Sequence, residues 1–176
     1  MKKIILSVLA LSTIVISGCG SSATNTINVQ DFSFAIPTSF QSISSSSLDQ
    51  AQIAHSIISA RKWDGNTLIL SESSLPSQIT IQQFTQDTQS RLNKNMIWYN
   101  DGKISSTSFM CNGKKITAYK HIFNQTELQD TKKIIMYFDQ LYFTYNKNVY
   151  ILSLAHQTEN SIFSDIIGTF WCIVKK

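Results

Sequence analysis

Ser59 and Lys62 have the Ser-x-x-Lys spacing of the penicillin-recognising enzymes, in which the serine is a nucleophile. That chemistry needs both side chains on one face of a helix, with Ser-Asp-Asn and Lys-Thr-Gly motifs elsewhere. Here the pair falls in a predicted strand, where positions three apart point to opposite faces. Neither companion motif and no Gly-x-Ser-x-Gly elbow occurs in the sequence. We therefore predict no catalytic residue and no enzyme, with a hydrolase as the least favoured alternative.

The sequence also contains no local motif for binding a metal ion or a phosphate group. His55, His121 and His156 are far apart in sequence and form no His-x-His or His-x-x-x-His pair. The six glycines are scattered, so no glycine-rich phosphate loop is present. We expect no metal site and no cofactor. A domain that binds a metal or a small ligand through residues brought together by folding stays open as an alternative.

The N-terminal residues 1–18 form a signal peptide by their pattern. Lys2-Lys3 precede an apolar run of thirteen residues, Ile4–Ile16, and small residues follow at Ser17-Gly18. A membrane-spanning helix needs about 20 residues, so the run is too short to stay as an anchor.

The end of this signal, Ile16-Ser17-Gly18-Cys19, resembles the bacterial lipobox. The resemblance implies that Cys19 is lipidated and becomes the first mature residue, which attaches the protein to a membrane. Two or more acyl chains anchor a protein stably in a bilayer. No aspartate follows Cys19, so in a Gram-negative cell we expect the periplasmic face of the outer membrane. In other cells we expect the outer face of the cytoplasmic membrane.

Cys111 and Cys172 are the remaining cysteines. Export places them where disulfides persist, and a bond between them would close a loop of about 62 residues, worth about 4 kcal/mol by chain entropy. Two buried free thiols are the alternative, and the sequence does not decide between them.

The length and the charge of the chain limit the classes of protein to which it can belong. Without residues 1–18, the 176-residue chain keeps 158 residues, which is one domain. The 15 basic residues against 11 acidic ones become 13 against 11, because Lys2 and Lys3 leave with the signal. No basic face is clustered enough to predict nucleic-acid binding. We expect a small polar tether over residues 19–26 and a single domain over residues 27–176.

Hydrophobic periodicity gives the elements of this domain. The predicted strands are residues 31–37, 56–63, 66–72, 96–99, 102–110, 115–123, 132–145 and 149–155, with a helical turn at 48–54 and a polar loop at 124–130. Thr80-x-x-Gln83 is a capping box that begins a helix over residues 81–93. A second helix, capped at Thr158, carries an apolar stripe from Ile162 to Trp171. This order predicts an α+β fold, an antiparallel sheet with helices on both faces.

Five tyrosines fall in the predicted strands: Tyr119, Tyr137, Tyr142, Tyr145 and Tyr150. Tyrosine is common in binding surfaces, but it is also a favoured strand residue that packs beneath a helix. We expect most of the five to pack, with their hydroxyl groups at the edge of the core.

The order of elements resembles the PsbP-like fold, which includes a photosystem II accessory protein, a nuclear-import factor that binds Ran, and DcrB-like bacterial lipoproteins. The matching segments are residues 32–37, 81–84, 114–119, 148–153 and 162–170. Phe40 stands where that family would have tryptophan. The resemblance implies a non-catalytic accessory module that binds another protein of the cell envelope.

Overall fold

The helices and strands follow the predicted order, with additional strands near both ends. The computed structural model describes residues 24–43, 56–63, 65–95, 99–129, 132–157 and 162–172. The strands are β1 (Thr24–Val29), β2 (Phe32–Pro37), β3 (Gln41–Ser42), β4 (Ser56–Trp63), β5 (Asn66–Ser74), β6 (Tyr99–Cys111), β7 (Lys114–Gln129), β8 (Lys132–Tyr145), β9 (Asn148–His156) and β10 (Trp171–Cys172). The helices are α1 (Ile81–Asn95) and α2 (Ile162–Gly168). Neither described helix has the length and apolar composition to cross a membrane.

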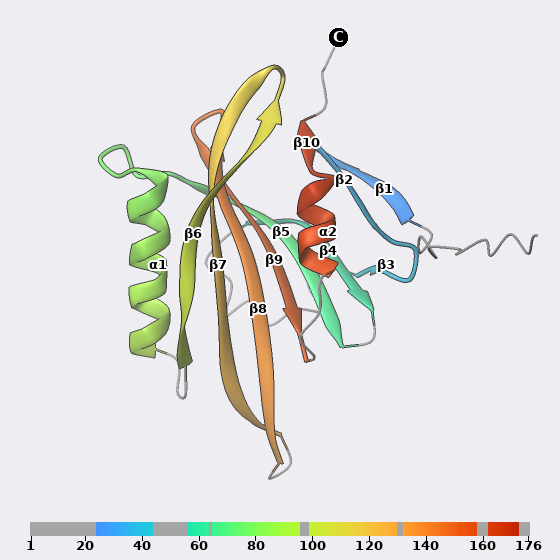
Figure 1. The fold of residues 1–176 in the computed structure, drawn as a ribbon, viewed down its shortest axis with the longest axis vertical. Coiled ribbons are helices and arrows are strands. Elements are labelled where there is room, and N and C mark those ends of the chain that lie inside the picture. The colour runs from blue at the N-terminus through green and yellow to red at the C-terminus, as the bar shows by residue number, and fades with distance from the viewer. Residues whose placement is uncertain are drawn as a thin grey trace, which may run out of the picture.

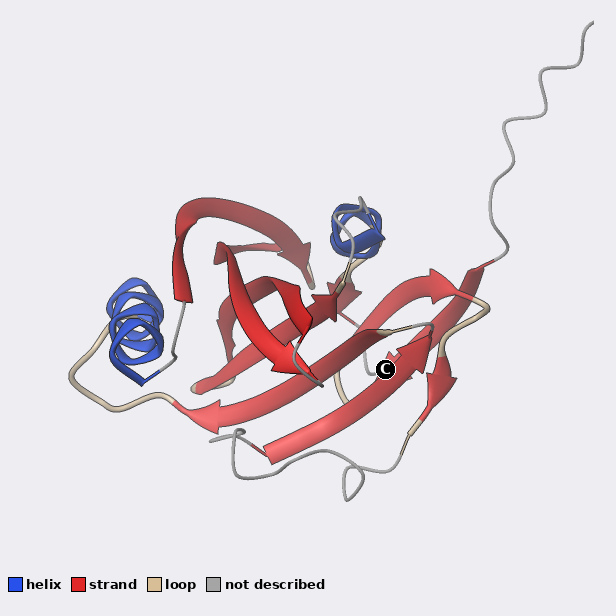
Figure 2. Cartoon of the chain, turned by 90° about the horizontal axis from the view of Figure 1, so that it is seen from below, coloured by secondary structure: helices blue, strands red, loops and turns tan. Residues whose placement is uncertain are grey.

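Seven strands form one antiparallel sheet in the order β3-β4-β5-β9-β8-β7-β6 (Figure 1). A second antiparallel sheet has the order β1-β2-β10, so β2 lies between segments from opposite ends of the chain. The two helices stand apart, with strands of the large sheet between them (Figure 2). The predicted α+β architecture is confirmed.

Strand β9 is buried on both of its faces. Val149 and Ile151 pack with Phe84 of α1 in one cluster. Leu152 and Leu154, which point the other way, pack in a second and larger cluster. Since side chains alternate along a strand, each face of β9 needs its own cover.

Helix α1 covers the first face and begins where the capping box predicts. The Thr80 backbone N–H donates to Gln83 Oε1 at 2.8 Å, and the Gln83 N–H donates to Thr80 Oγ1 at 3.2 Å. These two hydrogen bonds satisfy donors that a helix start leaves without partners.

Helix α2 and the small sheet cover the other face. The core there is aromatic, because the ring of Phe32 lies 5.3 Å from that of Phe143 and 5.5 Å from that of Phe170. The Phe109 ring of β6 contacts both Phe143 and Phe170, at 5.0 and 5.2 Å. Such edge and stacked ring pairs add to the free energy gained from burial.

Two of the tight turns have the backbone that their residues predict. Asn112 and Gly113 have φ of 49° and 74°, as the two-residue hairpin turn between β6 and β7 requires. Asn146 and Lys147 have φ of 49° and 71° between β8 and β9. Gly102 has a different role, since a Cβ there would lie 1.5 Å from the Ile122 carbonyl oxygen. That close approach accompanies the register shift of β6 between Asn100 and Lys103.

Two predicted boundaries near the ends of the chain were wrong. Residues 24–26, expected in the tether, pair with residues 35–37 as the start of β1, because strand pairing needs only backbone groups and β2 offers an open edge. Trp171, expected in the last helix, lies in β10 instead. Helix α2 ends at Gly168, and Thr169 Oγ1 then accepts a hydrogen bond from the Ala35 N–H at 2.9 Å.

A third boundary was wrong in the middle of the chain. The polar segment over residues 124–130, expected as a loop, continues β7 as far as Gln129. Its residues pair with β8 down to Gln129–Lys132. Polarity did not prevent strand formation, since these residues need no burial. The predicted turn at 48–54, the cap at Thr158 and the first residues of the 96–99 strand lie outside the described residues.

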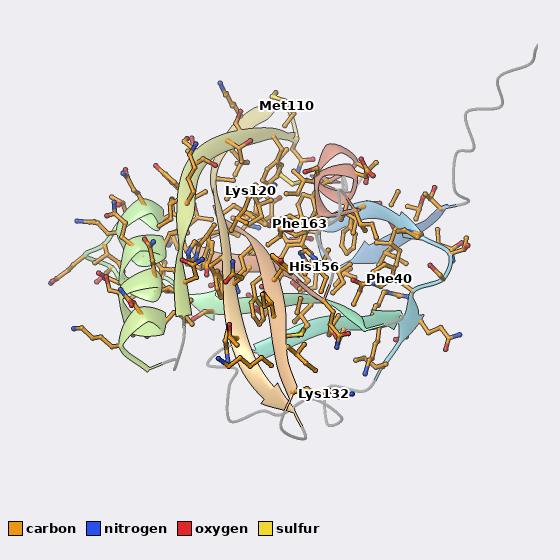
Figure 3. All side chains as sticks on the ribbon, turned by 60° about the horizontal axis from the view of Figure 1, so that its bottom comes forward. Phe40, Met110, Lys120, Lys132, His156 and Phe163 are labelled. Carbon is orange, nitrogen blue, oxygen red and sulfur yellow. A yellow bond between two sulfur atoms is a disulfide. The ribbon has the colours of Figure 1, made fainter. Side chains whose placement is uncertain are left out.

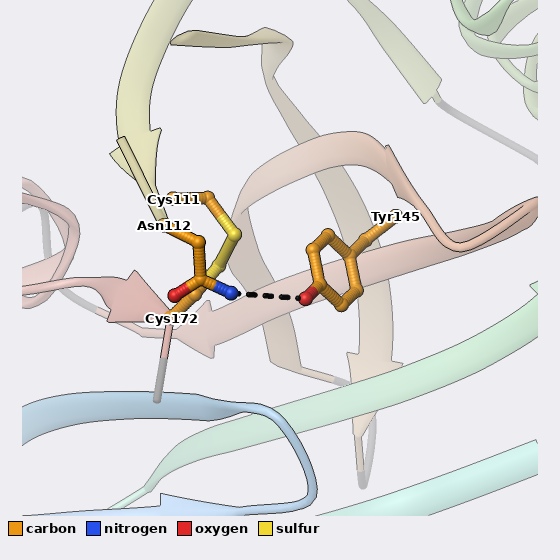
Figure 4. Close-up of a disulfide and its surroundings, with 4 residues drawn as sticks. All are labelled: Cys111, Asn112, Tyr145 and Cys172. Carbon is orange, nitrogen blue, oxygen red and sulfur yellow. Dashed lines mark hydrogen bonds between the residues drawn. A yellow bond between two sulfur atoms is a disulfide. The ribbon is translucent and has the colours of Figure 1, made fainter. Parts of the chain in front are cut away.

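Cys111 and Cys172 form a disulfide in the structure, with 4.8 Å between their Cα atoms (Figure 4). Both cysteines are buried. The bond joins the end of β6 in the large sheet to β10 in the small sheet. Beside it, Asn112 Nδ2 donates a hydrogen bond to the Tyr145 hydroxyl at 3.3 Å. Of the two alternatives left by the sequence, the structure has the bonded one.

We expect the Cys111→Ser/Cys172→Ser variant to lose about 4 kcal/mol of unfolding free energy, because the unfolded chain regains the freedom of a loop of about 62 residues. Urea unfolding of the purified protein with and without reductant measures this loss. Reductant should lower the midpoint of the wild type and leave that of the double variant unchanged. Equal midpoints for the oxidised wild type and the variant would contradict the stabilising role.

Candidate functional site

The polar residues singled out by sequence are placed apart by the fold. Ser59 and Lys62 lie on β4, and Lys62 is exposed. His121 is fully buried on β7, with its ring 4.7 Å from that of Phe123. Cys19 and His55 lie outside the described residues. Within the described ranges, no group of three His, Cys, Asp or Glu side chains is arranged to hold a metal ion.

His156 and Asp139 form a buried pair. His156 Nε2 lies 3.1 Å from Asp139 Oδ2, and the two residues are 2% and 7% exposed. They come from β9 and β8, on the face of the sheet that α2 covers further along. The ring of Tyr137 stacks on the imidazole, with 5.5 Å between ring centroids. The imidazole of His156 is thus held by a hydrogen bond to Asp139 and by the stacked ring of Tyr137.

The longest hairpin of the sheet extends beyond its neighbours. The pairing of β6 with β7 reaches Gln125, and the pairing of β9 with β8 reaches Tyr137. Residues 126–129 and 132–135 therefore pair only with each other among the described strands. We call this two-stranded part the arm; in Figure 1 it projects below the rest of the domain.

A partly apolar surface runs from the base of the arm along the α2 side. The register places Ile122 opposite Asp139, Asn124 opposite Tyr137 and Thr126 opposite Ile135, so all these side chains share one face. We call Ile122, Asn124, Ile135 and Tyr137 the arm face. Ile122 and Ile135 are 42% and 45% exposed, which is unusual for large apolar side chains in a sheet.

Lysines border this surface where it meets the covered core. Lys120 reaches α2, where its Nζ lies 5.6 Å from the centroid of the Phe163 ring and 3.5 Å from Ser164 Oγ (Figure 3). Lys103 of β6 pairs with Ile122 and is exposed. The arm face thus combines exposed apolar side chains with lysines at the end nearest α2; apolar residues bordered by a polar rim are common in protein interfaces.

A second polar cluster surrounds Glu72 of β5. Its carboxylate accepts hydrogen bonds from Asn148 Nδ2, from the Tyr150 hydroxyl at 3.3 Å and from Gln30 Nε2 at 3.5 Å. Burial raises the pKa of Tyr150, and the negative charge of Glu72 raises it further. These bonds join β5, β9 and the turn after β1, so the cluster stabilises the packing of the two sheets.

The predicted packing of the tyrosines is largely confirmed. Tyr142 and Tyr150 are buried, and Tyr119 packs against the α1 cluster while its hydroxyl donates to Gln82 Oε1 at 3.3 Å. Tyr137 differs, because it belongs to the arm face. The His156–Asp139 pair was not predicted from the sequence; the turn at Asn146-Lys147 fixes the β8–β9 register that brings the two residues together.

Solved structures similar to this one include those of cyanobacterial PsbP and yeast Mog1p. Against cyanobacterial PsbP (CyanoP) from Synechocystis sp. PCC 6803 the TM-score is 0.57, with 10% identity over 87% of this chain and 94% of CyanoP. Against the Ran-binding protein Mog1p of Saccharomyces cerevisiae it is 0.51, with 8% identity over 85% of this chain and 95% of Mog1p. No protein-family model and no curated protein sequence matches the chain.

The chain has a PsbP-like fold. The resemblance predicted from the order of elements is therefore confirmed at the level of fold. At these identities the PsbP-like domain shares its architecture with CyanoP and Mog1p, and the comparison assigns no site residue.

We expect Asp139→Ala to lower the unfolding free energy of the PsbP-like domain by about 3 kcal/mol, because it removes the carboxylate that pairs with a buried imidazole. Asp139→Asn should cost about 1 kcal/mol, since the amide oxygen still accepts from Nε2–H. The exposed Asp165→Asn is the matched control and should change stability by less than about 0.5 kcal/mol. Urea titrations followed by circular dichroism measure all three. Equal losses for the two Asp139 variants would contradict the hydrogen-bonding role.

Proposed function

We propose that the protein is a lipid-anchored component of the cell envelope whose PsbP-like domain is a non-catalytic module that binds another envelope protein through the arm face. The observation that carries the binding role is the exposure of Ile122 and Ile135 on one side of a projecting hairpin. Exposed apolar side chains on one face, beside polar residues, are typical of sites that bind other proteins.

The disulfide supports an extracytoplasmic location. Bonded cysteines persist in exported proteins and are rare in the reducing cytosol. The Cys111–Cys172 bond joins the two sheets, so the folded domain gains stability from the oxidising compartment that the signal sequence predicts.

The anchor comes from the sequence motif. Cys19 follows a short apolar signal and two small residues, and lipid on its thiol would hold the mature chain at a membrane. Strand β1 begins at Thr24, so only residues 20–23 separate Cys19 from the folded domain. The proposed partner is therefore a protein close to the same membrane.

The similar structures agree with a binding role. Mog1p is a Ran-binding protein by its description. The fold thus serves protein binding in at least one other chain, and we extend the role, but not the partner, to this one.

Cys19→Ala should release the protein from membranes and leave the domain folded, because the described core is built from residues that follow Cys19, beginning with Ile27 of β1. Fractionation of cells expressing the tagged protein measures the release, and circular dichroism with a melting curve checks the fold. Wild type is the membrane-bound control. If the variant sediments with membranes as fully as wild type, Cys19 is not the anchor.

A photoreactive amino acid at position 135 should capture a defined envelope protein in intact cells. The same group at Lys94, exposed on α1, is the matched control and should not capture it. Ile135→Asp, with the photoreactive group at position 122, should lower the yield about tenfold, because a carboxylate replaces an apolar contact worth about 1.5 kcal/mol.

Mass spectrometry identifies the captured protein and the linked residues. Capture at position 94 with the same yield as at position 135 would show that the arm face is not the binding surface. Capture of no protein from either position would reject the binding role.

A further inference from the structure

Strand β6 ends the large sheet and has a strand on one side only. It runs for 13 residues and pairs with β7, while the sheet order contains no strand beyond it among the described residues. Figure 1 shows β6 at the margin of the sheet. Other elements contact β6 near its two ends: Gln89 of α1 donates a hydrogen bond to the Gly102 carbonyl, while Phe170 packs on Phe109 and a disulfide joins Cys111 to β10. An edge of this kind offers backbone donors and acceptors to another strand.

The bulge and the charge that discourage strand pairing lie at the N-terminal end of β6. The register of β6 shifts between Asn100 and Lys103, and the Gly102 carbonyl already accepts a hydrogen bond from Gln89 Nε2 of α1 at 3.1 Å. Lys103 adds an exposed charge there. Bulges and charges are the usual devices that keep edge strands from pairing.

The rest of β6 has none of these devices. Residues 104–111 read Ile-Ser-Ser-Thr-Ser-Phe-Met-Cys, without charge and without proline, and their register with β7 is unbroken. Met110 in this segment is 58% exposed, more than the other exposed large apolar residues of the described chain.

The pattern of this segment is complementary to itself about Thr107. If a second copy pairs antiparallel with Thr107 on the two-fold axis, Ile104 lies opposite Met110 of the second copy, on the same face. Ser105 then lies opposite Phe109, and Ser106 opposite Ser108. Apolar side chains thus meet across the axis, the exposed Met110 gains a partner, and no like charges come together within residues 104–111.

We propose that two copies of this chain associate through their β6 strands, antiparallel about Thr107, so that the two large sheets become one continuous sheet. The contact is isologous, which closes the assembly at two copies. The occupant is a second copy because pairing about Thr107 brings the apolar Ile104 and Met110 together, places serine opposite serine at 106 and 108, and brings no charges together within residues 104–110. The inference is independent of the arm face and of lipid attachment.

The test is self-crosslinking of the full chain in the membrane of living cells. In the proposed register position 107 faces itself, at a Cβ separation that suits a disulfide. Thr107→Cys should therefore give a dimer on a non-reducing gel, in most of the protein after mild oxidation. Ser105→Cys, on the same strand and face but opposite Phe109, is the matched control and should give at least about fivefold less. Ile104→Cys combined with Met110→Cys should restore the dimer.

A second measurement needs no new cysteine. Ser106→Lys/Ser108→Lys places lysines opposite each other in the proposed register, so the dimer of the purified protein should weaken at least tenfold in sedimentation equilibrium. Ser74→Lys, exposed at the end of β5, should leave it unchanged. An unchanged melting curve of the monomer shows that the variants fold.

Several results would overturn the proposal. A monomeric wild type at all concentrations tested would do so, as would equal crosslinking from positions 105 and 107. A Thr107→Cys adduct with the mass of a different protein would assign the edge to another partner instead. Failure of arm-face capture with intact Thr107→Cys dimers would reject the proposed function and leave this inference standing.

Discussion

The two-sided burial of the central strands is the constraint on which the rest of the structure depends. Because Val149 and Ile151 of β9 face one way and Leu152 and Leu154 the other, the sheet cannot stand without a cover on each side. Helix α1 provides one cover. The other is shared between the short helix α2 and a small sheet made from both ends of the chain. The large sheet extends beyond the elements that cover it. The arm face lies on the part of the sheet that α2 does not cover.

Local chemistry made the turns and the first helix predictable. Asn112-Gly113 requires positive φ at two positions, and Thr80-x-x-Gln83 satisfies its own helix start, so neither depends on distant residues. The end of α2 was not predictable in this way. The apolar side chains of residues 162–171 suit a helix as well as a strand, and the chain leaves the helix because β2 and Cys111 lie within reach. Tertiary context of this kind decides local structure against periodicity.

The candidate site was less predictable than the fold for a related reason. Ile122 continues the apolar row of Ile116 and Ala118 on β7, so its sequence position looks like that of a core residue. Whether such a residue is covered depends on how far α2 reaches, and α2 has only seven residues. The contact between Asp139 and His156 depends on the β8–β9 register, which the two-residue turn at Asn146-Lys147 sets; a turn that also includes Asn148, as the sequence pattern suggests, leaves this register undetermined.

The early start of β1 has a consequence for how the domain sits at a membrane. With lipid on Cys19, five residue-to-residue steps of chain, from residue 19 to residue 24, would join the bilayer to the sheet, a reach of at most about 18 Å when fully extended. A domain held by so short a tether cannot reorient freely relative to the membrane. Its small sheet would stay toward the lipid, and only neighbours within the same thin layer above the headgroups would meet the remaining surfaces.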